Sequence, residues 1–271
     1  MSFSFCSLSS GSSGNCYVVK TEETALLIDA GISGKRIFEG LSALGIESSK
    51  LKGLLVTHEH IDHVKSVRIV AKKMPDLKVY GSDETLSEIS ECVCDERKAC
   101  VSQGIEFTIG DITIKPFALS HDARQPLGYS LSHGEKKICI VTDTGIISQE
   151  IHNEIRKADI LVIEANHDVH TLQFCRYPYP VKRRIMGDFG HLSNDAAAEE
   201  LSRICLEARE DDSIPGYRHV ILAHLSKETN FPEMAYQTVR NALEENSIYV
   251  GRELSIDIIE RDIISPVFTL D

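Results

Sequence analysis

Six consecutive residues hold the densest set of metal-binding side chains in the chain. The segment His58-Glu-His-Ile-Asp-His63 contains three imidazoles and two carboxylates, and it directly follows the aliphatic run Leu54-Leu-Val56 and Thr57. Imidazole and carboxylate donors together suit Zn, Mn or Fe, and alternate residues that leave the end of a strand can point the same way. A buried histidine cluster without a metal would hold unsatisfied or mutually repelling groups. The segment therefore predicts a metal site at the end of a strand.

Further motifs, in the same order along the chain, resemble one known family. The His-x-His-x-Asp-His pattern is the hallmark of the metallo-β-lactamase superfamily. Four other segments resemble its remaining motifs: Leu26-Leu-Ile-Asp29-Ala-Gly31, Ser120-His121, Val141-Thr-Asp143-Thr-Gly145 and Val220-Ile-Leu-Ala-His224. The resemblance covers nearly the whole chain. It implies an α/β fold, the four-layer αβ/βα sandwich in which two mixed sheets are flanked by helices.

The same resemblance implies two divalent transition metal ions (Zn, Mn or Fe) per chain. Carried over position by position, the ligands of one metal are His58, His60, His121 and Asp143, and those of the other are Asp62, His63, Asp143 and His224. Asp62 also counts among the expected catalytic residues. Two metals about 4 Å apart can share one hydroxide and clamp the attacking and leaving oxygens of a displacement.

Three further elements are similar to those of the phosphodiesterase branch of the family, which includes ribonuclease Z. His121 is followed shortly by Gly128-Tyr129, whereas glyoxalases and lactonases usually have a Gly-His-Thr-x-Gly element there. Ile163-Glu164-Ala-Asn166 resembles the His-Glu-Ala-Thr element of that branch, and Gly190-His191-Leu-Ser193 resembles its His-Ser-Thr element. The resemblance implies that His191 donates a proton to the leaving oxygen and that Glu164 raises the pKa of this imidazole. A helix-capping role for His191 is the structural alternative.

Over the whole chain, the sequence resembles the YycJ (WalJ)-like group, which is thought of as nuclease-like. It is carried by Ser7-Leu-Ser-Ser-Gly-Ser-Ser-Gly-Asn15, Ser120-His-Asp-Ala123, Glu164-Ala-Asn-His-Asp168, Tyr177-Pro-Tyr-Pro-Val-Lys-Arg-Arg-Ile185 and Gly190-His-Leu-Ser-Asn194. Ala165 stands where that group would have serine. Only 81 positions separate Asp143 from His224, too few for the β-CASP insertion of ribonuclease J enzymes. We therefore expect a single domain over residues 1–271.

Three other features are candidates for binding substrate. Lys182-Arg183-Arg184 is the densest basic run, and it either grips the phosphate backbone of a nucleic acid or forms a solvated helix face. His167 lies close to Glu164 in the chain and either orients a metal ligand or binds a substrate phosphate. The Ser/Gly loop 9–14 fits an anion-binding nest and a tight turn equally well.

The elements that must position these residues are read from hydrophobic periodicity. Short aliphatic runs predict strands over 2–8, 16–20, 25–29, 53–57, 78–80, 112–116, 128–132, 137–142, 160–164 and 219–223. Apolar residues with a period of 3.6 predict helices over 34–44, 64–73, 84–98, 149–156, 194–207 and 231–245. Asn194 is a plausible N-cap of its helix. From Asp143 onward, strands and helices alternate.

Composition excludes several classes of protein. The 271 residues are 42% hydrophobic and 26% charged, which rules out a disordered, collagenous or coiled-coil protein. A net charge of −12 argues against bulk electrostatic binding to nucleic acid or an anionic membrane, although a local basic patch remains compatible with it. No apolar run reaches the roughly 18 residues of a membrane span, and the N-terminus lacks signal-peptide features, so we expect a cytoplasmic protein without membrane contact.

The eight cysteines are expected to be buried free thiols. They lie mostly within apolar patterns, and the chain is not the small secreted domain in which cysteine spacing indicates disulfides. Cys92-x-Cys94-x5-Cys100 is a weaker alternative, a zinc site that lacks a matching second pair.

The sequence as a whole predicts a dinuclear metal-dependent hydrolase, a phosphodiesterase or nuclease that cleaves DNA or RNA. In this scheme a metal-bridging hydroxide attacks phosphorus and His191 protonates the leaving oxygen. One alternative is a small-substrate metallohydrolase: a cyclic phosphodiesterase, thioesterase or lactonase. The other is a regulatory nucleic-acid-binding protein with a vestigial site. The sequence does not identify protein partners.

Overall fold

The computed structural model describes residues 2–270, which form two compact units. The first comprises the chain up to Ala118 together with Ala123–Lys136 and the segment from Glu260 onward. The second comprises Leu119–Asp122 and Lys137–Ile259. The expectation of a single domain stays a prediction.

Hydrogen bonds between strands form two mixed seven-stranded sheets. The order in one is β14-β1-β2-β3-β4-β5-β6, from β14 (Phe268–Leu270), β1 (Phe3–Ser9), β2 (Cys16–Lys20), β3 (Ala25–Ile28), β4 (Leu51–Leu55), β5 (Lys78–Gly81) and β6 (Lys98–Cys100). The order in the other is β13-β12-β11-β10-β9-β8-β7, from β13 (Leu254–Ile258), β12 (Arg218–Ala223), β11 (Ile160–Glu164), β10 (Lys136–Val141), β9 (Leu127–His133), β8 (Ile112–Ala118) and β7 (Phe107–Ile109). Strands β3 to β6 and β10 to β13 pair in parallel.

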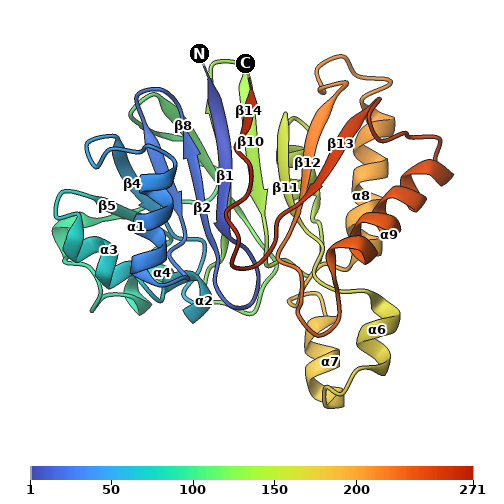
Figure 1. The fold of residues 1–271 in the computed structure, drawn as a ribbon, viewed down its shortest axis with the longest axis horizontal. Helices are drawn as coiled ribbons and strands as arrows, with labels where there is room; N and C mark the ends of the chain where they lie inside the picture. The colour runs from blue at the N-terminus through green and yellow to red at the C-terminus, as the bar shows by residue number, and fades with distance from the viewer. Residues whose placement is uncertain (1, 271) are drawn as a thin grey trace. The chain divides into compact units, whose positions relative to one another are not determined.

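The helices of the first unit pack on an aliphatic face of its sheet (Figure 1). They are α1 (Gly34–Ala43), α2 (Ile61–Val64), α3 (Val67–Lys73) and α4 (Asp83–Glu88). Ile37 of α1 and Val70 of α3 are fully buried in one core with Leu54 of β4. Strand β3 is buried along its whole length, which explains why Ala25–Ile28 is a continuous apolar run rather than an alternating one.

The helices of the second unit fall into two groups by their position relative to its strands. Helices α8 (Asn194–Glu207) and α9 (Pro232–Glu245) lie side by side and flank the parallel strands (Figure 1). Helix α5 (Gln149–Ile155) lies against α8, where His152 bonds Glu200 and Glu207. Helices α6 (Val169–Phe174) and α7 (Tyr179–Ile185) instead project beyond the ends of the strands of this unit (Figure 1). Within residues 2–270, no helix has both the length and the apolar character needed to cross a membrane.

Three sequence-based expectations about helices are wrong. The helix expected over 84–98 ends at Glu88, and the chain then turns so that Lys98–Cys100 can pair with β5. The helix expected over 64–73 is split in two, because the Ser66 amide donates to the Ala30 carbonyl (2.8 Å) instead of continuing α2. Ser193, not Asn194, caps α8, since the Ser193 hydroxyl accepts from the Ala196 amide.

The thiol expectation is confirmed in part. All eight cysteines are free, but Cys94 and Cys100 are exposed rather than buried. Among the described residues, no group of side chains placed to share a metal includes Cys92, Cys94 or Cys100.

Close backbone packing in the first unit leads to a stability prediction. A Cβ added to Gly31 would lie 1.6 Å from the Asp62 carbonyl oxygen, so the two backbone segments must separate in Gly31→Ala. We expect this variant to lose about 1–3 kcal/mol of unfolding free energy, measured by urea denaturation. Gly216→Ala is the matched control, because its new methyl group meets no atom within 4 Å. Equal stability of the two variants would contradict the packing described.

Candidate metal centre

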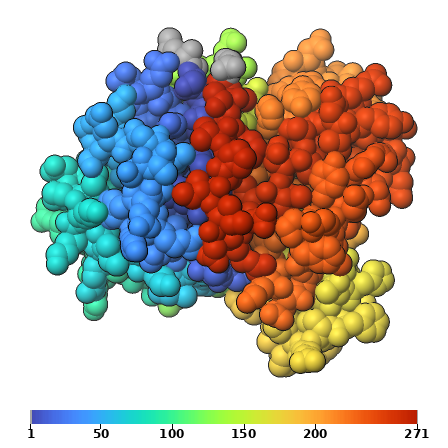
Figure 2. All heavy atoms as spheres, in the orientation of Figure 1, coloured from blue at the N-terminus to red at the C-terminus, as the bar shows by residue number. Residues whose placement is uncertain are grey.

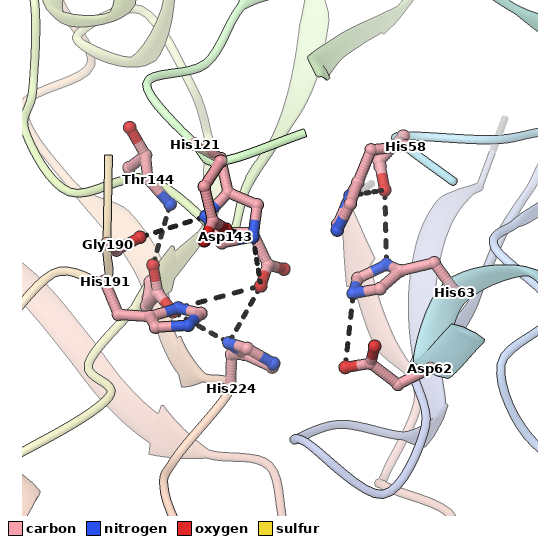
Figure 3. Close-up of polar contacts among 12 residues, drawn as sticks. His58, Asp62, His63, His121, Asp143, Thr144, Gly190, His191 and His224 are labelled. Atoms are coloured by element: carbon pink, nitrogen blue, oxygen red, sulfur yellow. Dashed lines mark hydrogen bonds and ion pairs between the residues drawn. The ribbon is translucent and has the colours of Figure 1, made fainter. Parts of the chain in front are cut away.

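The histidine-rich segment forms a compact group in the first unit, here named the His58 cluster: His58, His60, Asp62 and His63. The ring of His58 lies 4.6 Å from that of His60 and 4.0 Å from that of His63, measured between centroids. His58 and His63 are buried, whereas His60 is half-buried. Asp62 lies beside His63, with 3.7 Å between the carboxylate Oδ2 and the imidazole Nε2 (Figure 3). The structure thus brings these four predicted ligands together.

A buried carboxylate fixes the orientation of His63. Asp29 accepts hydrogen bonds from His63 Nδ1 (2.7 Å), from the Thr57 hydroxyl (2.8 Å) and from the Thr57 amide (2.8 Å). Asp29 follows β3 with a φ of 61°, in the left-handed region that non-glycine residues rarely adopt. A carboxylate that accepts from one imidazole nitrogen leaves the other nitrogen as a lone-pair donor, as in the second shell of histidine metal sites.

The partner of the other His63 nitrogen supports this tautomer. Asn15 Nδ2 lies 3.0 Å from His63 Nε2, while Asn15 Oδ1 accepts from the Gly11 amide (2.9 Å). The Gly11 contact fixes which end of the Asn15 amide is the donor. His63 Nε2 therefore accepts a hydrogen bond, and its lone pair is the one that a metal would take. This observation fits a nitrogen ligand.

A second group, named the Asp143 cluster, lies in the second unit and consists of His121, Asp143, Glu164, His191 and His224. Four of its members offer ligand atoms that all lie within 4.8 Å of one another: Asp143, Glu164, His191 and His224. Asp143 Oδ1 is 3.4 Å from His224 Nδ1, 3.7 Å from His191 Nδ1 and 3.9 Å from His121 Nε2 (Figure 3). Asp143 and His224 have φ values of 62° and 55°, so both are left-handed residues that follow a strand, like Asp29.

The fully buried carboxylate of Glu164 organises this cluster. Its Oε1 accepts from His191 Nδ1 (2.8 Å) and from His224 Nδ1 (2.7 Å). Its Oε2 accepts from the amides of Thr144 (2.9 Å) and Leu192 (3.3 Å). Burial alone would raise the pKa of Glu164, but the two histidines hold it below its ordinary value. Glu164 is therefore an ionised anchor for two imidazoles.

His191 is set apart by its charge. Burial lowers the pKa of its imidazole, but the adjacent Glu164 and Asp143 carboxylates override this effect and raise the pKa to about 9. His191 is thus an imidazolium at neutral pH, with Nδ1 bonded to Glu164. The capping alternative does not hold, because Ser193 caps α8 and the His191 amide donates to the Ile185 carbonyl (2.9 Å).

His121 has the opposite character. Burial is the main reason that its pKa is lowered, so this imidazole is neutral near pH 7. Nδ1 donates to the Gly190 carbonyl (3.0 Å), which leaves the Nε2 lone pair for a metal (Figure 3). Gly190 permits this approach of the chain because a Cβ there would lie 2.2 Å from the Ile185 carbonyl oxygen.

The predicted substrate-binding residues lie outside both clusters. His167 is buried, and burial lowers its pKa to about 4, so it is neutral at physiological pH. Lys182 donates to the Gln173 carbonyl (2.7 Å), and Arg184 is ion-paired with Asp122, the neighbour of His121. Arg183 is exposed and makes no ion pair within residues 2–270. The basic run is therefore not a set of three equivalent surface cations.

Sequence reasoning assigned no role to several polar residues that support the clusters. Thr57 donates to Asp29, the carboxylate that orients His63, and Asn15 Nδ2 donates to His63 Nε2. Asn166 Nδ2 donates to the His224 carbonyl (2.9 Å). The available signal was a threonine that ends an aliphatic run directly before the histidines, and two asparagines inside the quoted motifs.

The donor chemistry of both clusters suits divalent transition metals. It consists of imidazole nitrogens and carboxylate oxygens, without thiols. Neutral histidines held by carboxylates or carbonyls are the form in which imidazole binds metal.

Comparisons with known proteins agree with this architecture. Residues 24–209 match the model of the Beta-lactamase superfamily domain. The exodeoxyribonuclease YycJ of Bacillus anthracis is 36% identical over 94% of this chain and 95% of its own. The chain belongs to the metallo-β-lactamase superfamily. The exodeoxyribonuclease WalJ of Streptococcus pneumoniae is 35% identical over 98% of this chain and 97% of its own.

A solved structure shows the same fold. The metallo-β-lactamase fold protein YhfI from Bacillus subtilis superposes with a TM-score of 0.67, at 15% identity, over 98% of this chain and 99% of its own. Both the predicted fold class and the resemblance to the YycJ (WalJ)-like group are confirmed.

Metal content gives a direct test of the His58 cluster. We expect His60→Ala to bind less zinc or manganese than the natural chain, measured by elemental analysis after reconstitution and desalting, because one imidazole ligand is missing. His170→Ala is the matched control, since His170 is exposed and belongs to neither cluster. Full metal content in His60→Ala, with an unchanged circular dichroism spectrum, would remove His60 from the ligand set.

Proposed function

We propose that this metallo-β-lactamase-family chain is a metal-dependent phosphodiesterase that cleaves nucleic acid. The observation that carries the proposal is the Glu164–His191 pair, an imidazolium held by a buried carboxylate within the Asp143 cluster. A protonated imidazole beside metal-binding residues is suited to releasing a poor alkoxide leaving group. The relatives named exodeoxyribonucleases favour DNA over RNA as the polymer. A cytoplasmic location belongs to the same proposal.

We propose two divalent metal ions, with ligands drawn from both clusters. The first ion would be held by His58, His60, His121 and Asp143, and the second by Asp62, His63, Asp143 and His224. The order of the motifs along the chain and the donor set of each cluster support this assignment. Zn, Mn and Fe all suit these ligands. When bound, such ions act as Lewis acids that stabilise negative charge developing on the phosphoryl oxygens.

His191 is the proposed proton donor of this chain. When water attacks phosphorus and the ester P–O bond breaks, the departing oxygen must gain a proton. His191 can supply it from Nε2, because Nδ1 remains bonded to Glu164. The Glu164 carboxylate stays ionised and holds the ring in one orientation through the proton transfer. His167, neutral at physiological pH, would contact a substrate phosphate through a hydrogen bond rather than an ion pair.

A substrate panel tests the proposed function. The metal-free protein is reloaded separately with Zn, Mn or Fe and assayed on labelled DNA and RNA oligonucleotides, bis-p-nitrophenyl phosphate, a cyclic phosphodiester, a thioester and a lactone. We expect hydrolysis of the polymers and of the aryl diester, and loss of both activities with a chelator. Turnover of the thioester or lactone alone would identify a small-substrate hydrolase. Polymer binding without turnover of any compound would identify a binding protein with a vestigial site.

The leaving group tests the role of His191. We expect His191→Ala to cut turnover of a diester with an alkoxide leaving group by roughly 10²–10⁴-fold, because the departing oxygen has no proton donor. Hydrolysis of bis-p-nitrophenyl phosphate should suffer far less, since p-nitrophenolate departs unprotonated. Metal content is measured in the same preparation. Equal losses on the two substrates, with metal retained, would show that His191 positions the site rather than donating a proton.

The pH–rate profile tests Glu164. The proposed acid is active when protonated, so turnover falls as pH rises through the pKa of His191. Glu164→Gln removes the negative charge that raises this pKa, so the alkaline limb of the profile should move to lower pH. Because Glu164 also bonds His224, metal content is again measured. The control is Glu154→Gln, which removes a carboxylate that pairs with Lys137 elsewhere in the second unit. It should leave the alkaline limb of the pH–rate profile at the pH of the natural chain.

A further inference from the structure

The helical segment between Glu164 and His191, two members of the Asp143 cluster, has an unusual surface. Residues 169–189, named here the α6–α7 projection, stand out from the rest of the second unit (yellow in Figure 2). Phe174 is 84% exposed, Tyr179 74% and Phe189 65%. Val181 and Met186 are exposed as well. Exposed aromatic side chains grouped on one small segment indicate a binding surface rather than scattered apolar residues.

These aromatic residues do not hold the projection in place. Its two ends are joined by a bridge between His167 and Ser193, where the Asn194 amide donates to the His167 carbonyl (3.0 Å). Leu172 provides the anchoring side chain, because it is fully buried. The large exposed rings are therefore available to a ligand without loss of the fold.

The charge of the projection is opposite to that of the whole chain. It contains four basic residues (Arg176, Lys182, Arg183 and Arg184) against one acidic residue, Asp188, whereas the chain carries a net −12. Arg176 and Arg183 are exposed. Aromatic rings for stacking, interleaved with cations for phosphates, are the usual components of a surface that binds single-stranded nucleic acid.

The base of the projection is packed directly against the proposed catalytic residues. The α7 residue Ile185 accepts from the His191 amide, and Arg184 pairs with Asp122 beside His121. A Cβ on Gly145, two residues after Asp143, would lie 2.4 Å from the carbonyl oxygens of Gly187 and Asp188. A strand held by the projection would thus be fixed relative to His121, Asp143 and His191.

We propose that the α6–α7 projection binds unpaired nucleotides next to the phosphodiester that is cleaved. Phe174, Tyr179 and Phe189 stack on bases, and Arg176 and Arg183 contact phosphates. The inference rests on the proposed nuclease function and deepens it. The preferred substrate is a strand end with unpaired nucleotides, and a fully paired end must open before it is held.

The first experiment measures binding, so it does not depend on turnover. Fluorescence anisotropy compares the natural chain with the triple variant Phe174→Ala/Tyr179→Ala/Phe189→Ala on a single-stranded DNA of about ten nucleotides. We expect the affinity of the triple variant to fall about tenfold or more, because base stacking is lost. Tyr249→Ala, which removes an exposed aromatic ring outside the projection, should bind as the natural chain does. Equal affinity of the triple variant and the natural chain would overturn the proposal.

The salt dependence of binding tests the arginines separately. Arg176→Gln/Arg183→Gln should lower the slope of log affinity against log salt by about 0.7 for each phosphate of a single strand that the variant no longer neutralises. An unchanged slope would exclude these two residues as phosphate contacts. Anionic liposomes are the second probe: vesicle binding that is abolished in the triple variant, with DNA binding intact, would identify the projection as a membrane contact and overturn the proposal.

Cleavage assays separate this inference from the proposed function. On a duplex with a single-stranded tail, the triple variant should lose about tenfold or more in kcat/KM relative to its own rate on bis-p-nitrophenyl phosphate. A blunt duplex should show a smaller loss. Equal losses on tailed and blunt duplexes would contradict recognition of unpaired nucleotides, while phosphodiesterase activity itself would stand. If the natural chain hydrolyses no phosphodiester, the proposed function fails, and the anisotropy result still decides the role of the projection.

Discussion

The buried carboxylate of Glu164 is the interaction on which the Asp143 cluster depends. A charged group in a fully buried position is costly unless hydrogen bonds and opposite charge compensate it, and Glu164 accepts from two imidazoles and two backbone amides. One anion therefore fixes two histidines with different tasks: His224 as a proposed metal ligand and His191 as a proposed acid. The proposed ligand role of His224 and the proposed acid role of His191 both depend on this carboxylate. A substitution of Glu164 therefore affects both roles.

Backbone geometry supports the side chains in a second way. Asp29, Asp143 and His224 each follow a buried strand, and each has a positive φ. A left-handed residue at the end of a strand turns the chain sharply while the strand itself stays rigid, and such conformations persist only where surrounding hydrogen bonds determine them. For Asp29 those bonds come from three donors on Thr57 and His63. In each unit, a left-handed residue after a rigid apolar strand thus orients a polar side chain.

Much of this architecture was predictable, because the signals are local. The segment 58–63 follows an aliphatic strand, and several elements match their predicted bounds, such as β2 and α8. The hydrogen bond from His224 to Glu164 was not predictable, because the two residues are 60 positions apart and only folding brings them together. The helix expected over 84–98 failed because pairing of Lys98–Cys100 with β5 outweighed helical periodicity. Helices α6 and α7 were missed because they bury few side chains, so their sequence carries little amphipathic pattern.

The contact between Asn15 and His63 has a consequence for metal loading. Imidazole ligands often lose a proton when a metal binds, which makes affinity fall steeply in acid. His63 already keeps its proton on Nδ1, against Asp29, and offers its Nε2 lone pair to an amide. A metal that binds at Nε2 would therefore exchange places with the Asn15 amide and release no proton from this ring. Asn15, which directly follows the Ser/Gly loop 9–14, would then occupy the ligand position only until a metal binds. The Asn15 amide released in that exchange would be available to a group that binds beside the ion.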